Sequence, residues 1–302
     1  MLFKQMTVIG VGLIGGSLAL AAKRKGLVQT VVGYGNKRGD LHKAASMGAV
    51  DRFFLTLPKA IEGADLIVLA TPIGAFEHIT KAFAPYLKPG AIVTDVGSVK
   101  GELVSKIESL LSGGTPPAGR ASFVGGHPMA GSEKSGIQSA FPTLFDKALA
   151  ILTPTSKTDK KAVEKVSALW EGVGAEVVKI DPIKHDQVMA VVSHLPHLVA
   201  YSLMELFSHP RLIKSDMLSF AAGGLRDFTR IAESSPDMWR DIFRLNKTAI
   251  VEAIDLYQET LEKMKKAILA VPQKGGKPSA GNDDTLLKIL NNAKTIRQKI
   301  RS

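Results

Sequence analysis

A glycine-rich turn near the start of the chain constrains the fold more than any other segment. Residues 6–9 form a short, apolar and largely β-branched run, which is typical of a buried strand. The turn GVGLIG follows at residues 10–15, and residues 17–22 have the composition of a helix. In such a unit the first glycine makes a tight turn, the second lets a pyrophosphate approach, and the third lets helix and strand pack closely. We therefore predict that a dinucleotide binds at this helix N-terminus, through Gly10, Gly12, Leu13, Ile14 and Gly15. The alternative is a glycine turn in another kind of α/β unit.

Further apolar runs at residues 30–34, 66–70 and 91–95 alternate with helical or polar stretches. Strands that alternate with helices form a parallel sheet with right-handed crossovers. Residues 1–181 are therefore expected to form a Rossmann-type α/β domain with a doubly wound parallel sheet. Ligands of such sheets bind at the carboxyl ends of the strands, and we assign Thr71 and Pro72, which follow one strand directly, to the cofactor site.

The end of the second predicted strand bears on the choice of cofactor. An enzyme that uses NAD usually has an acidic residue there, which bonds the ribose 2′-hydroxyl group. This chain has Gly35 and Asn36 instead, followed by Lys37 and Arg38. No carboxylate repels a 2′-phosphate, and two cations are available to bind one. The sequence therefore favours NADP over NAD; the alternative is a solvated turn that tolerates NAD.

Residues 125–133, with the sequence GGHPMAGSE, contain one histidine between two glycines and a proline. A strand is expected to end near Val124, so His127 should lie in a turn at the carboxyl edge of the sheet. Glu133 adds a carboxylate six residues later. Because a dehydrogenase needs a group that handles a proton, His127 is the catalytic candidate.

The second half of the chain has a helical pattern. Residues 174–180 predict a last strand, and Asp181 with Pro182 predicts the start of a helix, with Asp as the cap and Pro in the first turn. We therefore expect a helical domain over residues 182–302, which by analogy with similar architectures supplies substrate contacts and a dimer interface. Residues 273–284 predict a loop, with a short amphipathic helix after it.

Two clusters in this half could carry chemistry. The first is SHLPH at residues 193–197, which has two histidines at i and i+3. No third ligand can be named, so we expect no metal site, and His194 could equally be a core residue. The second cluster begins at Gly223 and contains Asp227 and Arg230. A guanidinium group matches a carboxylate bidentately, which makes Arg230 a candidate for substrate binding; a helix salt bridge between Asp227 and Arg230 is the alternative.

Composition excludes several classes of protein. There is no cysteine, which excludes disulfides, thiolate catalysis and Cys-ligated zinc. No apolar run approaches the roughly 20 residues that span a bilayer, and we expect a cytoplasmic enzyme without a membrane partner. The net charge is +11. More than half of it lies in residues 259–302, which have ten basic and four acidic residues and almost no aromatic side chain on which bases could stack. We therefore expect an anionic small molecule as partner and no nucleic acid.

Together these motifs resemble the prephenate and arogenate dehydrogenase family of tyrosine biosynthesis. The resemblance covers about residues 6–260. It depends on GVGLIGGS, DVGSVK at 95–100, GGHPMAGSE, SHLPH, and GGLRDFTRIAESSPDMWRDI at 223–242. It implies an NAD(P)-dependent oxidative decarboxylation of a cyclohexadienol, prephenate or arogenate, that ends in an aromatic phenol.

The resemblance also implies roles for individual residues. His127 would accept the proton of the ring hydroxyl, and Ser98 would orient this hydroxyl and the nicotinamide; a helix cap is the alternative role of Ser98. Arg230 would bind a substrate carboxylate, and His197, rather than His194, would contact the substrate. The remaining substrate-site residues that it implies are Glu133, Asp227, Gly223 and Trp239. Trp239 would reach the site of the neighbouring subunit in a homodimer.

Two other readings share the architecture. A β-hydroxyacid dehydrogenase or imine reductase also joins a Rossmann domain to a helical one, but typically uses a lysine where this chain has histidines and an arginine. A catalytically silent NADP-binding sensor needs the glycine turn, but has no need of His127, Ser98 and Arg230. The motifs do not discriminate between prephenate and arogenate.

Overall fold

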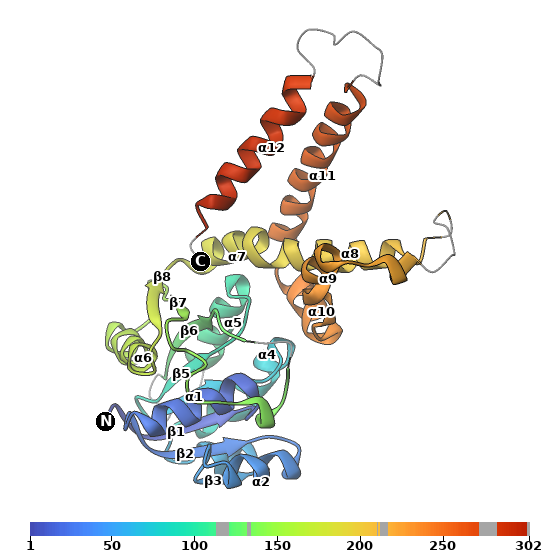
Figure 1. The fold of residues 1–302 in the computed structure, drawn as a ribbon. Coiled ribbons are helices and arrows are strands. Elements are labelled where there is room, and N and C mark those ends of the chain that lie inside the picture. Colours follow the sequence, from blue (N-terminus) through green and yellow to red (C-terminus); the bar gives the residue numbers. More distant parts are fainter. Residues whose placement is uncertain (113–120, 132–133, 210, 212–216, 272–282, 301–302) are drawn as a thin grey trace. The chain divides into compact units, whose positions relative to one another are not determined.

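The computed structural model describes residues 1–112, 121–131, 134–209, 211, 217–271 and 283–300. The chain divides into two compact units, Met1–Lys247 and Thr248–Ser302, and Figure 1 traces its course through them. The predicted boundary between residues 181 and 182 lies inside the first unit. It stays a prediction about how cofactor and substrate binding are divided.

A sheet forms the centre of the first unit. Among the described residues it has eight strands in the order β3-β2-β1-β4-β5-β6-β7-β8. The expected doubly wound parallel sheet is confirmed with one exception, because β6 and β7 pair antiparallel, with Gly126 opposite Leu152. The strands are β1 (Phe3–Ile9), β2 (Val28–Tyr34), β3 (Arg52–Phe54), β4 (Leu66–Leu69), β5 (Ile92–Asp95), β6 (Ser122–Pro128), β7 (Leu149–Thr153) and β8 (Glu176–Lys179).

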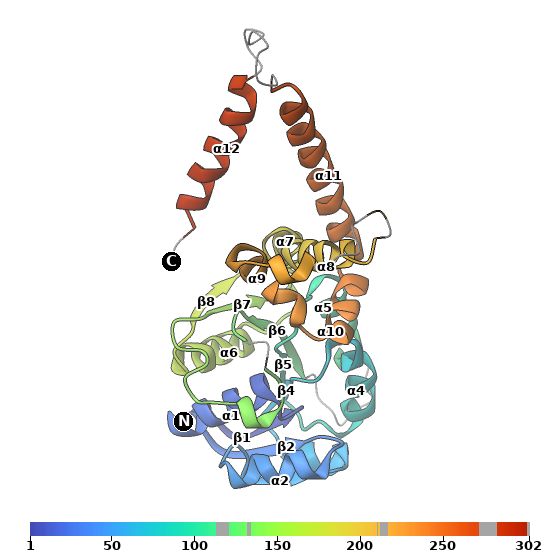
Figure 2. The same cartoon turned by 45° about the vertical axis from the view of Figure 1, so that its right-hand side comes forward.

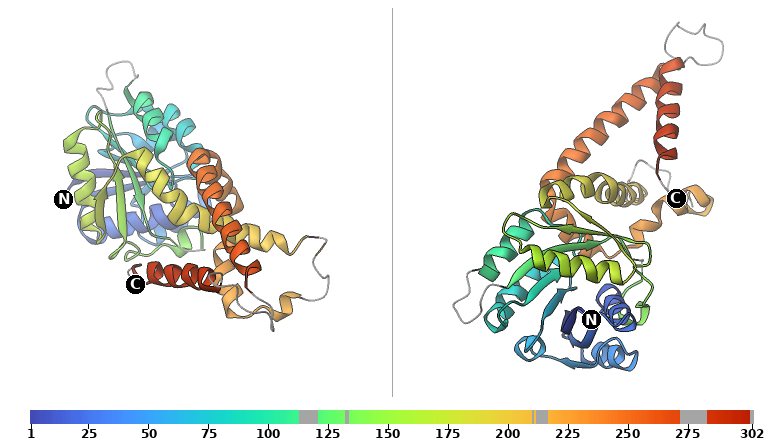
Figure 3. Two further views of the ribbon diagram at one scale, coloured as in Figure 1. Left: turned by 90° about the horizontal axis from the view of Figure 1, so that it is seen from above. Right: turned by 90° about the vertical axis from the view of Figure 1, so that its left-hand side faces the viewer.

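Helices cover both faces of this sheet. They are α1 (Leu13–Arg24), α2 (Arg38–Ser46), α3 (Leu57–Ile61), α4 (Phe76–Phe83), α5 (Gly101–Ser112) and α6 (Lys160–Gly172), with short 3₁₀ turns η1 (Ile73–Ala75), η2 (Ala84–Tyr86) and η3 (Ile137–Ser139). Consecutive residues of β4 point to opposite faces of the sheet and pack in two different hydrophobic cores. Val68 packs in the core that contains Leu18 of α1 and Trp170 of α6, whereas Leu69 packs in the core that contains Phe76 of α4. Figures 2 and 3 show helices on the two sides of the strands.

The chain becomes helical after β8. As predicted, Asp181 caps the next helix: its side chain accepts hydrogen bonds from the backbone N–H groups of Ile183 and Lys184, and Pro182 lies in the first turn. A π-helical turn over residues 190–194 interrupts the helix before Pro196, which lacks a backbone N–H. The elements are α7 (Pro182–Met189), η4 (Ala190–His194), α8 (Leu195–Leu206), η5 (Met217–Phe220), α9 (Gly223–Thr229), η6 (Arg230–Glu233) and α10 (Pro236–Leu245).

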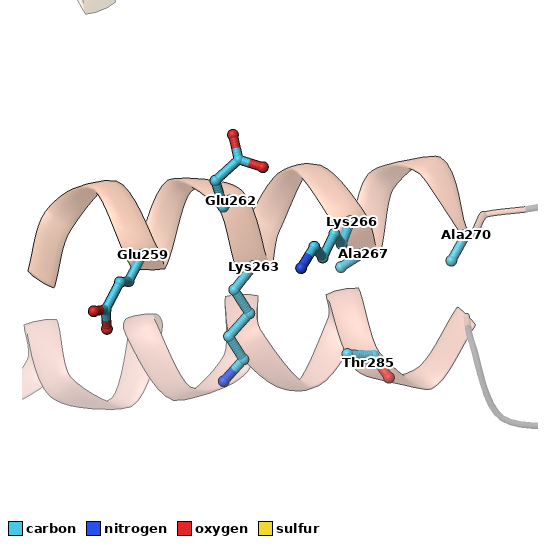
Figure 4. Close-up of a pocket in the computed structure, with 7 residues that line it drawn as sticks. All are labelled: Glu259, Glu262, Lys263, Lys266, Ala267, Ala270 and Thr285. Atoms are coloured by element: carbon cyan, nitrogen blue, oxygen red, sulfur yellow. The ribbon is translucent and has the colours of Figure 1, made fainter. Parts of the chain in front are cut away.

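The second unit consists mainly of two helices, α11 (Lys247–Leu269, which begins at the unit boundary) and α12 (Asp283–Gln298). The helix expected after the loop is present as α12. Of the predicted loop over 273–284, residues 273–282 lie outside the described residues, and 283 and 284 are helical. A groove of about 480 Å³ runs between the two helices. Figure 4 shows Glu259 and Lys263 of α11 pointing toward α12. None of the described helices combines the length and the apolar content needed to cross a bilayer.

Candidate active site

The glycine turn has the geometry that a dinucleotide requires. Gly10 has a φ of 97°, and a Cβ atom on it would lie 2.6 Å from the backbone of Ala70. A Cβ atom on Gly15 would lie 2.4 Å from the Gly10 oxygen, whereas one on Gly12 would meet none of the described atoms within 4 Å. Two glycines therefore permit close packing and the middle one leaves its side of the turn open, as the predicted roles demand. Leu13 and Ile14 then form the first turn of α1.

The other predicted cofactor residues lie at the ends of β2 and β4, the two strands that flank β1. Thr71 and Pro72 follow β4, and Thr71 N would be 2.7 Å from a Cβ atom on Gly10. At the end of β2, Gly35 is half-buried. Three exposed residues follow it, in the order Asn36, Lys37 and Arg38.

Arg38 also has a partner that the sequence did not suggest. Its Nε atom lies 3.4 Å from Nε2 of His42, one turn further along α2. Lys37 and Arg38 make this corner at the end of β2 electropositive.

His127 lies inside β6, which corrects the expectation of a turn. The glycines before it serve close packing instead. A Cβ atom on Gly125 would lie 2.4 Å from Thr153 Oγ1, and one on Gly126 would lie 2.7 Å from the Asp95 backbone oxygen. Larger residues would force these strands apart. The His127 side chain is thus held on a rigid, buried strand and is 8% exposed.

A buried carboxylate joins the two predicted catalytic segments. Asp95, at the end of β5, accepts hydrogen bonds from Gly97 N at 2.8 Å and from Gly126 N at 2.9 Å. It also pairs with the ammonium group of Lys100, and both side chains are completely buried. Asp95 therefore ties the segment that contains Ser98 to the strand that contains His127. Removal of one member of such a pair typically costs about 3–5 kcal/mol, because the other charge is left buried without a partner.

A chain of hydrogen bonds extends from His127 away from the sheet. Its Nδ1 atom lies 2.9 Å from Nε2 of His185, whose Nδ1 atom lies 2.8 Å from Oδ1 of Asp186. The Asp186 carboxylate also accepts hydrogen bonds from the backbone N–H groups of Lys100 and Gly101, both at 2.8 Å. This carboxylate, from α7, therefore meets the N-terminus of α5. The Asp186 carboxylate therefore caps α5. Capping this helix was the alternative role for Ser98, which is half-buried.

Burial keeps the histidines of this region neutral. It lowers the pKa of His127 well below 6.5, and the neighbouring His185 and Lys100 act in the same direction. Burial also lowers the pKa of His185, although its hydrogen bond to Asp186 opposes this shift. For His194, burial lowers the pKa to about 4. At neutral pH, His127 is therefore uncharged and can accept a proton.

Both histidines of the SHLPH segment, His194 and His197, contact the indole of Trp239. His197 stacks on Trp239, with the ring centroids 3.8 Å apart and the planes at 25°, and its Nδ1 atom donates to the Ser193 oxygen at 2.9 Å. His194 lies edge-on to the same indole, at 6.0 Å. It is 1% exposed, and its Nδ1 atom lies 3.1 Å from Asn246 Nδ2. Within the described part of the chain, His194 Nε2 and Trp239 Nε1 are buried without a hydrogen-bond partner. Trp239 is buried against His197 of its own chain; its expected reach into the site of a neighbouring subunit stays a prediction.

The remaining predicted substrate residues lie on the short helices that follow. Gly223 and Asp227 are on α9, Arg230 begins η6, and all three are exposed. Both α9 and η6 pack against α8, the helix that contains His197. Glu133 lies outside the described residues.

Sequence reasoning missed the groups that support His127. Asp95 and Lys100 were part of the DVGSVK motif, but their mutual burial was not foreseen. His185 and Asp186 follow the predicted helix cap Asp181 by four and five residues. The only sequence signal for their support of His127 was a histidine followed directly by an aspartate. The groove of the second unit, between α11 and α12, contains none of the predicted site residues.

Comparisons with known proteins cover nearly the whole chain. Residues 18–179 match the family described as "Prephenate dehydrogenase, nucleotide-binding domain", and residues 181–291 match "Prephenate dehydrogenase, dimerization domain". Prephenate dehydrogenase of Bacillus subtilis is 38% identical over 85% of this chain and 68% of its own length. Cyclohexadienyl dehydrogenase of Zymomonas mobilis is 33% identical over 88% of this chain and 89% of its own.

Solved structures give the same result. Prephenate dehydrogenase from Aquifex aeolicus, in complex with hydroxyphenyl propionate and NAD⁺, has a TM-score of 0.88 and 36% identity, and the match covers 99% of this chain and 98% of that one. Arogenate dehydrogenase from Synechocystis has a TM-score of 0.79 and 29% identity, over 98% of this chain and 99% of that one.

Proposed function

Because the chain belongs to the prephenate dehydrogenase family, we propose that it catalyses the NAD(P)-dependent oxidative decarboxylation of prephenate, arogenate or both in tyrosine biosynthesis. The observation that carries this proposal is His127, a neutral, buried imidazole that the strands hold rigidly beside the segment of Ser98. One of its ring nitrogens is engaged by His185, which leaves Nε2 for a substrate.

The reaction needs a base and anchors for the substrate. A bound nicotinamide supplies the acceptor for the hydride that leaves the carbon bearing the ring hydroxyl. In our proposal His127 Nε2 takes the proton of this hydroxyl while the carbonyl forms. The ring carboxylate then leaves as carbon dioxide. Its bonding electrons pass through the ring to the carbonyl oxygen, which takes the proton back from His127 and becomes the phenol of the aromatic product. Ser98 orients the hydroxyl group toward His127.

The substrate anchors come from the helical segment. Arg230 is proposed to bind a carboxylate, with Asp227, Gly223 and Glu133 bordering the pocket. His197 is proposed to contact the substrate through Nε2, because its Nδ1 atom is used by Ser193. Trp239 supports His197 by stacking.

The cofactor site favours NADP in this proposal. The exposed side chains of Asn36, Lys37 and Arg38 offer donors to a 2′-phosphate and no carboxylate that would repel it. Gly10, Gly12 and Gly15 suit the pyrophosphate, whichever cofactor binds.

We also infer a homodimer that forms through the helical domain, for which we propose residues 182–302. The exposed apolar side chains of α11 and α12 support this inference, since a single chain leaves them in water: Leu256, Leu261, Ile268, Leu269, Leu287, Leu290 and Ile296. We propose a cytoplasmic location, in keeping with a chain that has no cysteine, and no nucleic-acid partner.

The test is nicotinamide reduction by the purified protein, with prephenate or arogenate, each paired with NAD or NADP. The proposal expects turnover with at least one pair, and the fastest pair identifies substrate and cofactor. If the protein binds a dinucleotide but turns over neither substrate, the proposed function is wrong.

A further inference from the structure

Three buried groups, His127, His185 and Asp186, form a single line of hydrogen bonds with links of 2.9 and 2.8 Å. His185 is completely buried and Asp186 is 6% exposed. The far end of this line is fastened to the first N–H groups of α5. Because the groups are enclosed, each link requires one donor and one acceptor.

The direction of each bond follows from the Asp186 end. Each oxygen of its carboxylate already accepts a backbone N–H, so we take the carboxylate as the acceptor in its bond with His185 as well. His185 Nδ1 must then donate to Asp186. A neutral His185 that is protonated at Nδ1 has a lone pair at Nε2, so Nδ1 of His127 must donate to it. The proton of neutral His127 is thereby placed on Nδ1, and its Nε2 atom is left as a lone pair.

We propose that His185 and Asp186 are positioning residues: they hold His127 as the Nδ1–H tautomer and offset the charge that it gains when Nε2 accepts the substrate's hydroxyl proton. The proposal rests on the dehydrogenase function proposed above. The proton comes from the ring hydroxyl, and no group of this relay is consumed in the step.

The intervening histidine has a physical consequence. A carboxylate in direct contact with His127 would raise its pKa. With His185 between them, the negative charge of Asp186 is further away from His127. Burial, reinforced by the neighbouring His185 and Lys100, lowers the pKa of His127, so the resting imidazole stays neutral. When His127 becomes charged, its Nδ1–H bond to His185 is strengthened, because bonds from charged donors are stronger than neutral ones.

Other contacts fix the position of Asp186. A Cβ atom on Gly101 would lie 2.5 Å from Asp186 Oδ2, so only glycine lets α5 meet this carboxylate so closely. Asn246 Nδ2 donates to the backbone oxygen of Asp186 at 2.8 Å. The relay is thus held by α5 on one side and by the end of α10 on the other.

The first test reads the tautomers in the wild-type protein. Long-range ¹H–¹⁵N spectra of histidine-labelled wild-type protein at neutral pH report which ring nitrogen carries the proton. We expect Nδ1–H for His127 and His185. We expect the opposite, Nε2–H, for His194, because Asn246 Nδ2 donates to Asp186 O and to His194 Nδ1. His127→Asn identifies the His127 signals. A resting His127 with its proton on Nε2 would overturn the proposal.

The second test is Asp186→Asn, which keeps the shape and removes the charge. We expect kcat to fall by about 10²–10⁴, since a catalytic histidine in the wrong tautomer loses about 10⁴ in serine proteases. The KM values for substrate and cofactor should stay within about threefold. The control is Asp159→Asn, whose carboxylate caps α6 through Lys161 N and touches no histidine. An unchanged kcat in Asp186→Asn would contradict the proposed positioning role of Asp186.

A second pair of variants, both at His185, tests the relay independently of whether Asp186→Asn folds. The side-chain oxygen of His185→Gln can still accept from His127 Nδ1, whereas His185→Phe leaves that proton without an acceptor. We expect kcat of the glutamine variant to exceed that of the phenylalanine variant by about tenfold or more, and equal values would contradict the relay. A wild-type protein that turns over neither substrate but shows the expected tautomers would refute the dehydrogenase proposal and leave the hydrogen-bond directions intact.

Discussion

The imidazole of His197 lies flat against the indole of Trp239, with ring centroids 3.8 Å apart. The two rings come from α8 and α10, so the stack is a tertiary contact between segments that are separate in the chain. Stacked aromatic pairs contribute about 0.5–1.5 kcal/mol beyond their buried area. The contact orients His197 from one side, while the Ser193 oxygen holds its Nδ1 atom from the other.

Trp239→Ala should therefore weaken substrate binding more than chemistry. We expect the KM for the substrate to rise about tenfold, which corresponds to about 1.4 kcal/mol, with kcat changed by less than threefold. Trp239→Phe retains a stacking ring and serves as the control. Steady-state kinetics at saturating cofactor provide the measurement. Equal KM values in wild type and Trp239→Ala would show that the stack does not support substrate binding.

Loss of the proposed base should affect turnover alone. His127→Asn is expected to lower kcat by about 10²–10⁴, the usual contribution of general acid–base catalysis. Dinucleotide affinity, measured by fluorescence titration or calorimetry, should stay nearly unchanged, because the glycine turn is untouched. Normal turnover in this variant would remove His127 from its role.

Arg230→Ala should raise the substrate KM by about 10- to 100-fold, since a hydrogen bond to a charged group contributes about 1.5–3 kcal/mol. Arg226→Ala removes another exposed arginine from the neighbouring turn of α9 and is the matched control. If the two variants have the same KM, Arg230 is a structural residue.

The cofactor preference can be tested at the end of β2. Lys37→Glu places a negative charge beside the expected 2′-phosphate, and should shift the NADP-to-NAD ratio of kcat/KM toward NAD by about tenfold or more. Lys43→Glu makes the same charge change on an exposed position of α2, one turn or more away. No shift in the ratio, or equal shifts in both variants, would place the discriminating residue elsewhere.

The buried histidines make stability depend on pH. Burial lowers the pKa of His194 to about 4, below its ordinary value of 6.5. The unfolded chain therefore takes up a proton at this residue first as the pH falls, and the folded state loses stability between pH 6.5 and 4. At pH 4.5 this residue should cost about 2–3 kcal/mol of the unfolding free energy relative to pH 7. Denaturant unfolding of wild type and His194→Gln at both pH values measures it; an equal pH dependence in the two proteins would contradict the expectation.

Local sequence was sufficient for much of the architecture. The glycine spacing at 10–15 requires a strand and a helix that meet closely, and the structure has both glycine contacts. The cap formed by Asp181 and Pro182 was likewise predictable, because its hydrogen bonds join residues two and three positions apart. Both features depend on contacts between residues that are close in the chain, so the residue types in a short segment are enough to predict them.

The catalytic surroundings depend on distant residues. His127 was expected in a turn, but glycines at 125 and 126 indicate either a turn or a close strand approach, and only the pairing with β7 decides between them. The contact of His127 with His185 spans 58 positions and that of Lys100 with Asp186 spans 86. No local pattern specifies such contacts.

The sequence by itself determined the dinucleotide fold, the start of the helix at Asp181 and the candidate for the proton-accepting residue, His127. The tertiary structure decided that residue's protonation state, because burial and hydrogen-bond partners set the charge and tautomer of an imidazole, and these are supplied by β5, α5 and α7 once they are packed around it.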